Sequence, residues 1–402
     1  MKKVGLKIFV VVVAAFIILS SFNINFGVIS SLPNTAIIST SDIKFLNENN
    51  IFGRFVQSSI SDISVDNTQK KTAKMWIKLF GFIPIRQIEV ELTKGEEVYV
   101  GGIPLGFSIK TQGLLVVGNN NIIADDGKTT TEKSGNILDG DIITKINGQE
   151  IYDFSDITNI VENSTKPLNL TLLRGKKEIE RTVEAELDIE SGEKKIGLWV
   201  KNDTNGIGTL TYVKIADNRF GALGHAITDY ETGTQIPVQS GKIYKCNQVG
   251  INKAEKNNPG ELRCVFLQGI NQKGTIDKNS KFGVFGHVDE LSSVVDYNRT
   301  AEIGSRLGVK VGKASIISNV SGVREEYSIE IIKTSYQPEE DDKSFIFRVT
   351  DSRLLKLTGG ILQGMSGSPI MQNGKLIGAI THVFVSDPTK GYGIYADWMA
   401  GQ

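Results

Sequence analysis

Short apolar runs alternate with turn residues through the carboxy-terminal half of the chain, residues 191–402. Runs such as "TLTYVKI", "GVFGHV" and "SFIFRVT" are bounded by Gly, Asn and Asp, which is the pattern of many short strands. Strands at this spacing are typical of a sandwich or a barrel, and the length of the region suits two packed barrels. We therefore predict a mainly β fold, with an all-β domain over residues 191–402.

The segment before it, residues 96–190, is predicted to be a smaller compact domain. The stretch "GNILDGDIITKINGQEI" predicts a strand, an Asn-Gly hairpin turn and a second strand. Residues 153–164 begin with acidic side chains and then place apolar ones at helical spacing, which predicts a helix. Residues 167–187 predict a further hairpin with its tip at residues 174–177.

The amino terminus carries a different pattern, with lysines at positions 2, 3 and 7 followed by an unbroken apolar run from Ile8 to Leu19. No clear small-residue cleavage site follows this run, so we interpret residues 1–26 as an uncleaved signal anchor, a transmembrane helix, rather than a cleaved signal peptide. The positive end then stays in the cytoplasm and the rest of the chain is exported.

Residues 27–95 join this anchor to the first domain. They begin as a polar segment rich in Ser, Asn and Asp without a sustained period, which we interpret as a stalk. Towards the end of the segment, Ile88, Val90 and Leu92 alternate with polar residues and predict a half-buried strand.

Composition and motif content argue against several classes of function but assign none. Lys and Arg together number 45, as do Asp and Glu, so the zero net charge gives no support for a nucleic-acid partner. Cofactor motifs are absent, and the three histidines show no metal spacing, so we expect neither a cofactor nor a metal. Cys246 and Cys264 are compatible with a disulfide in an oxidising compartment and equally with two buried free thiols.

The stretch "GMSGSPIM" carries the first candidate chemistry. A nucleophilic serine needs a tight turn that presents its hydroxyl, backbone N–H groups that hold the developing oxyanion, and a base. Ser366 lies on such a turn, the N–H groups of Gly364 and Ser366 are candidates for the oxyanion hole, and Gly367 leaves the approach open. An ordinary β-turn uses the same residue types, so the motif alone leaves both readings open.

A histidine base strengthens the catalytic reading. His225 in "GALGHAITD" follows a glycine at the predicted end of a strand and has apolar neighbours, which suits a base in a partly buried cleft. His287 in "FGVFGHVDE" is a competitor with a similar Gly-His context. His382 lies on the strand after the serine, where we expect a structural or substrate-lining role.

The block over residues 96–190 resembles a PDZ domain, through the string "LDGDIITKINGQEI". In that resemblance, Pro104, Leu105, Gly106 and Phe107 correspond to the loop whose N–H groups hold the carboxylate of a peptide tail. A small β-rich module without a peptide ligand is the alternative.

The stretches "FGALGHAITD" and "TDSRLLKLTGGILQGMSGSPIMQNGKLIGAITHVFVSDPTKGYGIYADWM" resemble the stage IV sporulation protein B peptidases of endospore-forming Firmicutes. The resemblance implies a PDZ domain followed by a trypsin-like double β-barrel serine peptidase domain. His225 then corresponds to the base, Ser366 to the nucleophile and Asp351 to the acid. Asp351 also suits the N-cap of a short helix. Asp229 and then Asp289 are weaker candidates for the acid, and a histidine–serine pair without an acid is a further possibility.

The resemblance also implies a role. It implies a serine endopeptidase in the space between the two forespore membranes, which is released from its anchor by self-cleavage in the amino-terminal region. Because residues 27–95 are polar and join the anchor to the first domain, we predict that the cut falls within them. The substrate of the peptidase is expected to be a membrane-associated regulator of an intramembrane protease that matures a late sigma factor. The alternative is a non-catalytic PDZ scaffold with a degenerate peptidase domain.

Overall fold

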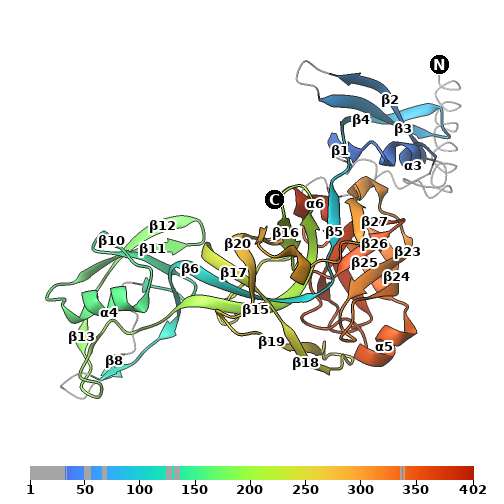
Figure 1. Cartoon of the computed structure of the whole chain (residues 1–402). Helices are drawn as coiled ribbons and strands as arrows, with labels where there is room; N and C mark the ends of the chain where they lie inside the picture. Colours follow the sequence, from blue (N-terminus) through green and yellow to red (C-terminus); the bar gives the residue numbers. More distant parts are fainter. Residues whose placement is uncertain are drawn as a thin grey trace, which may run out of the picture.

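The computed structural model describes residues 32, 34–48, 56–65, 70–123, 129–130, 136–335, 337 and 340–402. Strands dominate these residues, which confirms the predicted mainly β fold (Figure 1). The predicted anchor over residues 1–26 lies outside the described residues. Among those described, no helix is both long and apolar enough to cross a membrane.

A four-stranded sheet forms the amino-terminal part, with strand order β1-β4-β3-β2. Its elements are β1 (Thr35–Ser39), α3 (Asp42–Glu48), β2 (Val56–Val65), β3 (Lys71–Leu79) and β4 (Ile83–Thr93). The alternation predicted for β4 is confirmed, because Ile88, Val90 and Leu92 are buried. The predicted stalk is wrong for the described residues, since Ile38, Leu46 and Val56 each supply one buried side chain to the core of this sheet. With only one or two buried apolar residues each, β1, α3 and β2 show no local period, so tertiary packing decides the structure of that segment.

The amino-terminal sheet is docked on the carboxy-terminal half. Leu307, in the 3-10 turn η3 (Arg306–Gly308), is fully buried within the core of the sheet. Ser39 and Ser41 donate hydrogen bonds to the carboxylate of Glu302, and Lys375 pairs with both Glu302 and Asp42. One buried apolar side chain and a network of ion pairs and hydrogen bonds therefore hold the two parts together.

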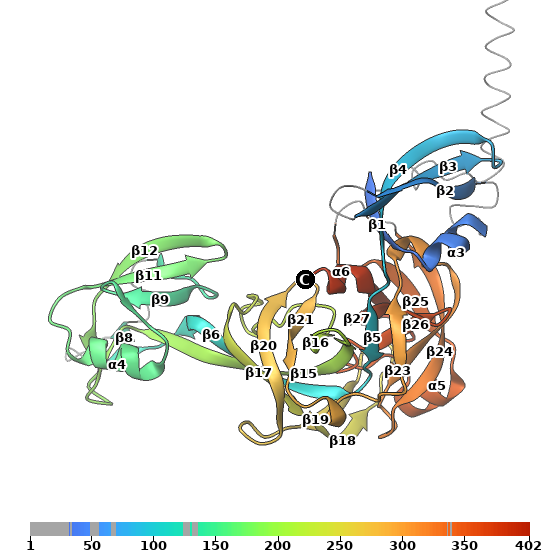
Figure 2. The ribbon, with the colours of Figure 1, turned by 45° about the horizontal axis from the view of Figure 1, so that its top comes forward.

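Two long strands, β6 (Pro104–Asn119) and β15 (Leu198–Lys214), pair antiparallel along most of their length. The chain between them forms a block that projects away from the rest in both views (Figures 1 and 2). Its elements are β7 (Ile122–Ile123), β8 (Thr129–Thr130), β9 (Ile142–Ile146), β10 (Gln149–Glu150), α4 (Phe154–Glu162), β11 (Leu168–Arg174), β12 (Lys177–Val183), β13 (Glu186–Leu187) and β14 (Lys194–Lys195). The predicted helix, the 174–177 hairpin tip and the Asn147-Gly148 turn are confirmed, and both residues of that turn are left-handed.

The remaining strands, apart from one separate hairpin, belong to one closed hydrogen-bonded system. Their side chains fill three buried clusters, the third of which contains Val98, Ile303 and Met399. Around the first cluster lie β5 (Glu97–Val100), the first half of β6, β15, β16 (Arg219–Ala222), β17 (Val238–Lys245), β20 (Gln272–Ser280), β21 (Gly283–Val288) and η2 (Leu291–Ser293). Around the second lie β22 (Thr300–Ile303), β23 (Gly312–Ser318), β24 (Glu325–Thr334), β25 (Phe345–Val349), α5 (Ser352–Thr358), β26 (Pro369–Gln372), β27 (Lys375–Val383), β28 (Lys390–Tyr395), α6 (Ala396–Ala400) and the hairpin of β18 (Asn247–Asn252) and β19 (Glu261–Val265). Cys246 and Cys264 are buried at the base of that hairpin as free thiols.

The expected peptide-binding loop at Pro104–Phe107 is corrected by this arrangement. Those four residues are the first part of β6 and pair with β15, while Leu105 to Phe107 also pair with β17 on the other side. Leu105 and Phe107 are fully buried in the first cluster. A strand paired on both sides has no N–H groups left in a row for a carboxylate, so this segment belongs to the core rather than to a ligand site.

Candidate active site

The serine turn connects the end of a buried loop to β26. Gly364 and Gly367 both adopt φ 93, a left-handed conformation that favours glycine. Between them Met365 is fully buried, which leaves Ser366 at the partly exposed crest of the turn. The two left-handed glycines and the buried methionine explain why the "GMSG" pattern presents one hydroxyl outward.

Along this turn, backbone N–H groups that donate a hydrogen bond alternate with N–H groups that do not. The N–H of Met365 donates to the carbonyl of Leu362 (3.1 Å), and that of Gly367 donates to the carbonyl of Ile380 (2.7 Å). Within the described part of the chain, the N–H groups of Gly364 and Ser366 donate to no backbone or side-chain acceptor. Two unpaired amides, one from the serine itself and one from the residue two positions before it, are what an oxyanion hole requires.

The Ser366 hydroxyl donates to the backbone carbonyl of Thr381 on β27, at 2.9 Å. Among the hydrogen bonds of the described residues, none joins Ser366 to His225. The hydroxyl therefore has to rotate from the Thr381 carbonyl to a base before it can attack, as is common in free enzymes.

The His225 turn follows β16 and is made by two left-handed residues, Leu223 (φ 69) and Gly224 (φ 73). A leucine in that region is uncommon, and such strain persists only where the surrounding structure enforces it. The Nδ1 atom of His225 lies 2.9 Å from the carbonyl oxygen of Ala226. Because a carbonyl only accepts, Nδ1 carries the proton and Nε2 is left as a proton acceptor. Burial lowers the pKa of His225, so the ring is neutral at neutral pH.

Thr209 on β15 ties the two turns together. Its N–H donates to the carbonyl of Ser366 (2.8 Å), and its own carbonyl accepts from the N–H of Leu223 (3.2 Å). Its hydroxyl donates to the carbonyl of Gly364 at 2.9 Å. A methyl group on Gly367 would lie 2.5 Å from the Leu223 nitrogen, which shows how closely the serine and histidine turns approach.

Asp351 does not contact His225 in the structure. Its carboxylate caps α5 by accepting from the N–H of Arg353 (2.9 Å), and it also accepts from the N–H of Ser328 (3.2 Å) and pairs with the Arg353 guanidinium. These bonds lower the pKa of Asp351 to about 2. Figures 1 and 2 both place α5 at the edge of the molecule. The N-cap interpretation is confirmed, and the geometry does not support Asp351 as the acid beside His225.

The weaker acid candidates are also accounted for. Asp229 lies in a turn where a solvent-exposed carboxylate is the ordinary expectation, but it is buried and accepts from the N–H groups of Glu231 and Thr232. Asp289 is exposed, and its neighbour His287 lies on β21 between β16 and β20, on a different strand from either catalytic candidate. The carboxylate that acts electrostatically on His225 belongs instead to Asp342.

Three residues near the site gave little or no signal in the sequence. Thr209 and Asp342 belong to no recognisable motif, because they act through contacts between distant segments. His382 was set aside as structural or substrate-lining, yet its ring lies 5.3 Å from the His225 ring, centroid to centroid.

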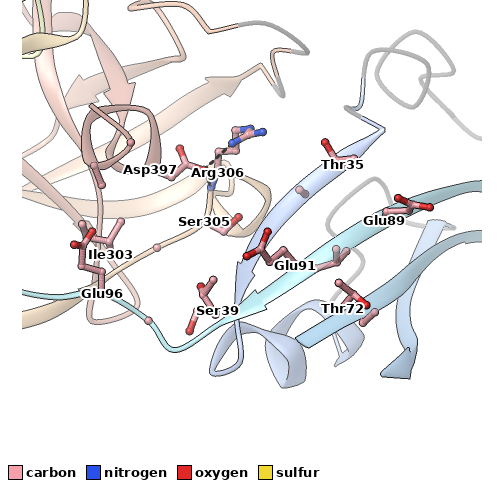
Figure 3. A pocket seen from close by; sticks show the side chains of 18 of the residues that line it. Thr35, Ser39, Thr72, Glu89, Glu91, Glu96, Ile303, Ser305, Arg306 and Asp397 are labelled. Carbon is pink, nitrogen blue, oxygen red and sulfur yellow. Dashed lines mark hydrogen bonds and ion pairs between the residues drawn. The ribbon is translucent and has the colours of Figure 1, made fainter. Parts of the chain in front are cut away.

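A separate cavity of about 1090 Å³ lies between the amino-terminal sheet and the carboxy-terminal half. Figure 3 shows Ser39 and Glu91 on the sheet side and Ser305, Arg306 and Asp397 on the other. Its lining includes neither Ser366 nor His225. The cavity is therefore a feature of the docked sheet and lies outside the catalytic candidates.

A family model described as SpoIVB peptidase S55 matches residues 192–400. No curated protein matches the chain. Among solved structures, the PDZ domain of an SdrC-like protein from Listeria monocytogenes is 16% identical and covers 22% of this chain and 87% of its own, with a TM-score of 0.18. The active form of the Rv3671c protease from M. tuberculosis is 14% identical, covering 50% of this chain and 73% of its own, with a TM-score of 0.26.

The HtrA-type protease AlgW, solved with a decapeptide, is 10% identical and covers 75% of this chain and 63% of its own, with a TM-score of 0.28. TM-scores this low do not establish a shared overall arrangement. The family match, by contrast, spans both the His225 turn and the Ser366 turn.

Proposed function

The chain belongs to the SpoIVB peptidase S55 family of serine peptidases, and we propose that Ser366 is its nucleophile and His225 its general base. One observation carries the proposal: Thr209 binds the two turns to each other, and the serine turn has unpaired N–H groups at Gly364 and Ser366. Nucleophile, base and oxyanion donors thus come from segments far apart in sequence and meet at one place.

The reaction follows from these positions. The Ser366 hydroxyl leaves the Thr381 carbonyl, gives its proton to Nε2 of His225, and Oγ bonds to the substrate carbonyl carbon. The N–H groups of Gly364 and Ser366 hold the oxyanion that forms. The imidazolium then protonates the leaving amine as the carbon–nitrogen bond breaks. Water, deprotonated by His225, attacks the acyl-enzyme, and the proton returns to Oγ as the acid leaves.

In this scheme the Ala226 carbonyl fixes the histidine tautomer, a task that a carboxylate performs in a catalytic triad. We therefore propose a histidine–serine pair oriented by backbone, with the Asp342 charge acting on His225 without a hydrogen bond. Asp351 supports the site through α5, the helix that precedes the serine loop.

We further propose that the chain is exported, tethered by its amino terminus, and released by self-cleavage during sporulation signalling. The support is the family and the predicted anchor. A peptidase binds its substrate as an extended, unpaired segment, so the paired strands β1 to β4 are poor substrates while the sheet is folded. We therefore expect the cut within residues 27–95 to fall outside these strands. Amino-terminal sequencing of the released form tests this, and a start within β1 to β4 would contradict it.

The block between β6 and β15 is proposed to be a PDZ-type module that binds a peptide tail, from this chain or from a regulatory substrate. Its support is the strand and helix order confirmed above. Pro104–Phe107 takes no part in this proposal, because it lies in the core.

The decisive experiment on catalysis uses the full chain and its Ser366→Ala variant. The wild type is expected to release its amino-terminal segment, and the variant to stay intact. Mixing the two, with the variant carrying a distinguishable tag, tests whether the wild type cleaves the variant in trans. A Ser366→Ala variant that processes itself at the wild-type rate would overturn the proposal and favour a scaffold.

A further inference from the structure

His382 lies beside the proposed catalytic pair and has no role in the scheme above. It follows Thr381 on β27, and the Thr381 carbonyl receives the Ser366 hydroxyl. Its ring centroid lies 5.3 Å from that of His225, with the two ring planes tilted by 36°. The strand that holds the nucleophile's hydroxyl therefore also holds a second imidazole against the base.

The surroundings of His382 leave its ring partly buried and neutral. Its backbone pairs with that of Tyr392 on β28, whose ring stacks on Phe384 at 4.5 Å. Its Nδ1 atom is buried and has no hydrogen-bond partner among the described residues. Burial is the main cause that lowers the pKa of His382 to about 4, with contributions from His225 when it is protonated and from Lys343, so the ring is uncharged at neutral pH.

The His225 ring, by contrast, makes one hydrogen bond to the part of the chain that the structure describes, from its Nδ1 to the Ala226 carbonyl. In a triad, a carboxylate bond opposite the nucleophile fixes the plane of the ring. Within the described residues no carboxylate bonds to the His225 ring, so rotation about its side-chain torsions has to be limited by packing. The ring that packs on it is His382.

We propose that His382 is a positioning residue of the peptidase reaction, whose neutral ring holds the His225 ring with Nε2 towards Ser366 and shields it from water. The proposal rests on the function proposed above for His225 and Ser366. It gives β27 two tasks, since Thr381 places the hydroxyl and His382 places the base.

The proposal predicts a specific electrostatic change. The charged or titratable groups that face the pair are Asp342 and Lys343 from the segment before β25 and the two rings themselves. Burial is the main cause that lowers the pKa of His225. Removing the His382 ring admits water to His225, which raises the pKa of His225 towards its ordinary value; a phenyl ring in its place keeps the water out.

The chain has three histidines, so its imidazole signals can be assigned one by one. We would label histidine with ¹³C in the full chain, purified through a histidine-free tag, and titrate it by NMR in a Ser366→Ala background. In that background the pKa of His225 is measured whether or not the enzyme cleaves anything. Expected is a higher His225 pKa in His382→Ala, and a value close to that of the background protein in His382→Phe. His287→Ala is the matched control, because His287 lies on another strand.

Kinetics in the Ser366-containing chain complete the test. His382→Ala is expected to lower kcat by about tenfold through loss of orientation, with the acid limb of kcat/KM moved to higher pH, and His382→Phe to lose clearly less. An unchanged His225 pKa in His382→Ala, or a His382→Phe variant as defective as His382→Ala, would overturn the positioning role. If His382→Ala does not fold, the His382→Phe titration and kcat alone decide, because the proposal requires both to stay near those of the parent. Failure of the catalytic proposal would appear separately, as cleavage that survives Ser366→Ala.

Discussion

Replacing Thr209 by valine tests how the site is assembled. Valine keeps the shape of threonine and the two backbone bonds of residue 209, so the change removes only the hydroxyl that donates to the Gly364 carbonyl at 2.9 Å. Thr209 is 2% exposed, so water does not replace the lost donor easily. A hydrogen bond of this kind contributes about 1 kcal/mol to stability.

The same bond holds the residue that supplies an oxyanion amide. If losing this bond raises the activation free energy by about 1 kcal/mol, kcat falls about fivefold. The melting temperature should also fall, by about 2–4 °C. Steady-state cleavage of a peptide substrate and a thermal scan measure the two effects on one sample.

Thr111→Val is the matched control for Thr209→Val. Thr111 is fully buried on β6, and its hydroxyl donates to the carbonyls of Gly113 and Asn202. Its loss should lower the melting temperature to a similar degree and leave kcat unchanged. A Thr209→Val variant that is destabilised like the control and keeps the wild-type kcat would refute this role, because the hydroxyl would then stabilise the fold without organising the serine turn.

Three further predictions concern other groups. Asp351→Ala should destabilise α5 by about 1 kcal/mol through loss of its N-cap. Asp351→Asn still caps the helix and should keep kcat within about threefold. A loss of kcat near 10⁴-fold in Asp351→Asn, as for a triad acid, would contradict the N-cap assignment. Because the neutral form of His225 is the base and burial lowers its pKa, kcat/KM should rise with pH with a midpoint below the ordinary histidine value of about 6.5. A midpoint above that value would count against this base. Cys246 and Cys264 should resist a thiol reagent in the folded protein and both react after denaturation; a denatured protein without free thiols would show a disulfide instead.

Local patterns were sufficient where one short segment determines its own structure. The Asn147-Gly148 turn needs two left-handed residues, and few residue types tolerate that conformation. The serine turn is similar, since Gly364 and Gly367 carry its geometry. Strand β4 was predictable because its burial alternates along a single face.

Predictions failed where distant segments decide the outcome. The sequence around Pro104 resembles a ligand loop, but β15 and β17 arrive from more than ninety residues away and make it a central strand (Thr209 pairs with Pro104, Lys245 with Leu105). The elements β1, α3 and β2 of the amino-terminal sheet were missed because, among the described side chains, each offers only one or two buried apolar residues. Likewise, nothing local marks Thr209 or Asp342, since their roles arise only when the two turns meet.

The central claim is that Ser366 is a nucleophile activated by His225. Labelling the intact chain with a fluorophosphonate, which captures activated serine hydroxyls, tests this without knowledge of the substrate. We predict that the label attaches to Ser366 in the wild-type chain, that Ser366→Ala takes up none, and that His225→Ala reacts far more slowly. Labelling at another serine, or equal labelling of wild type and Ser366→Ala, would contradict the account.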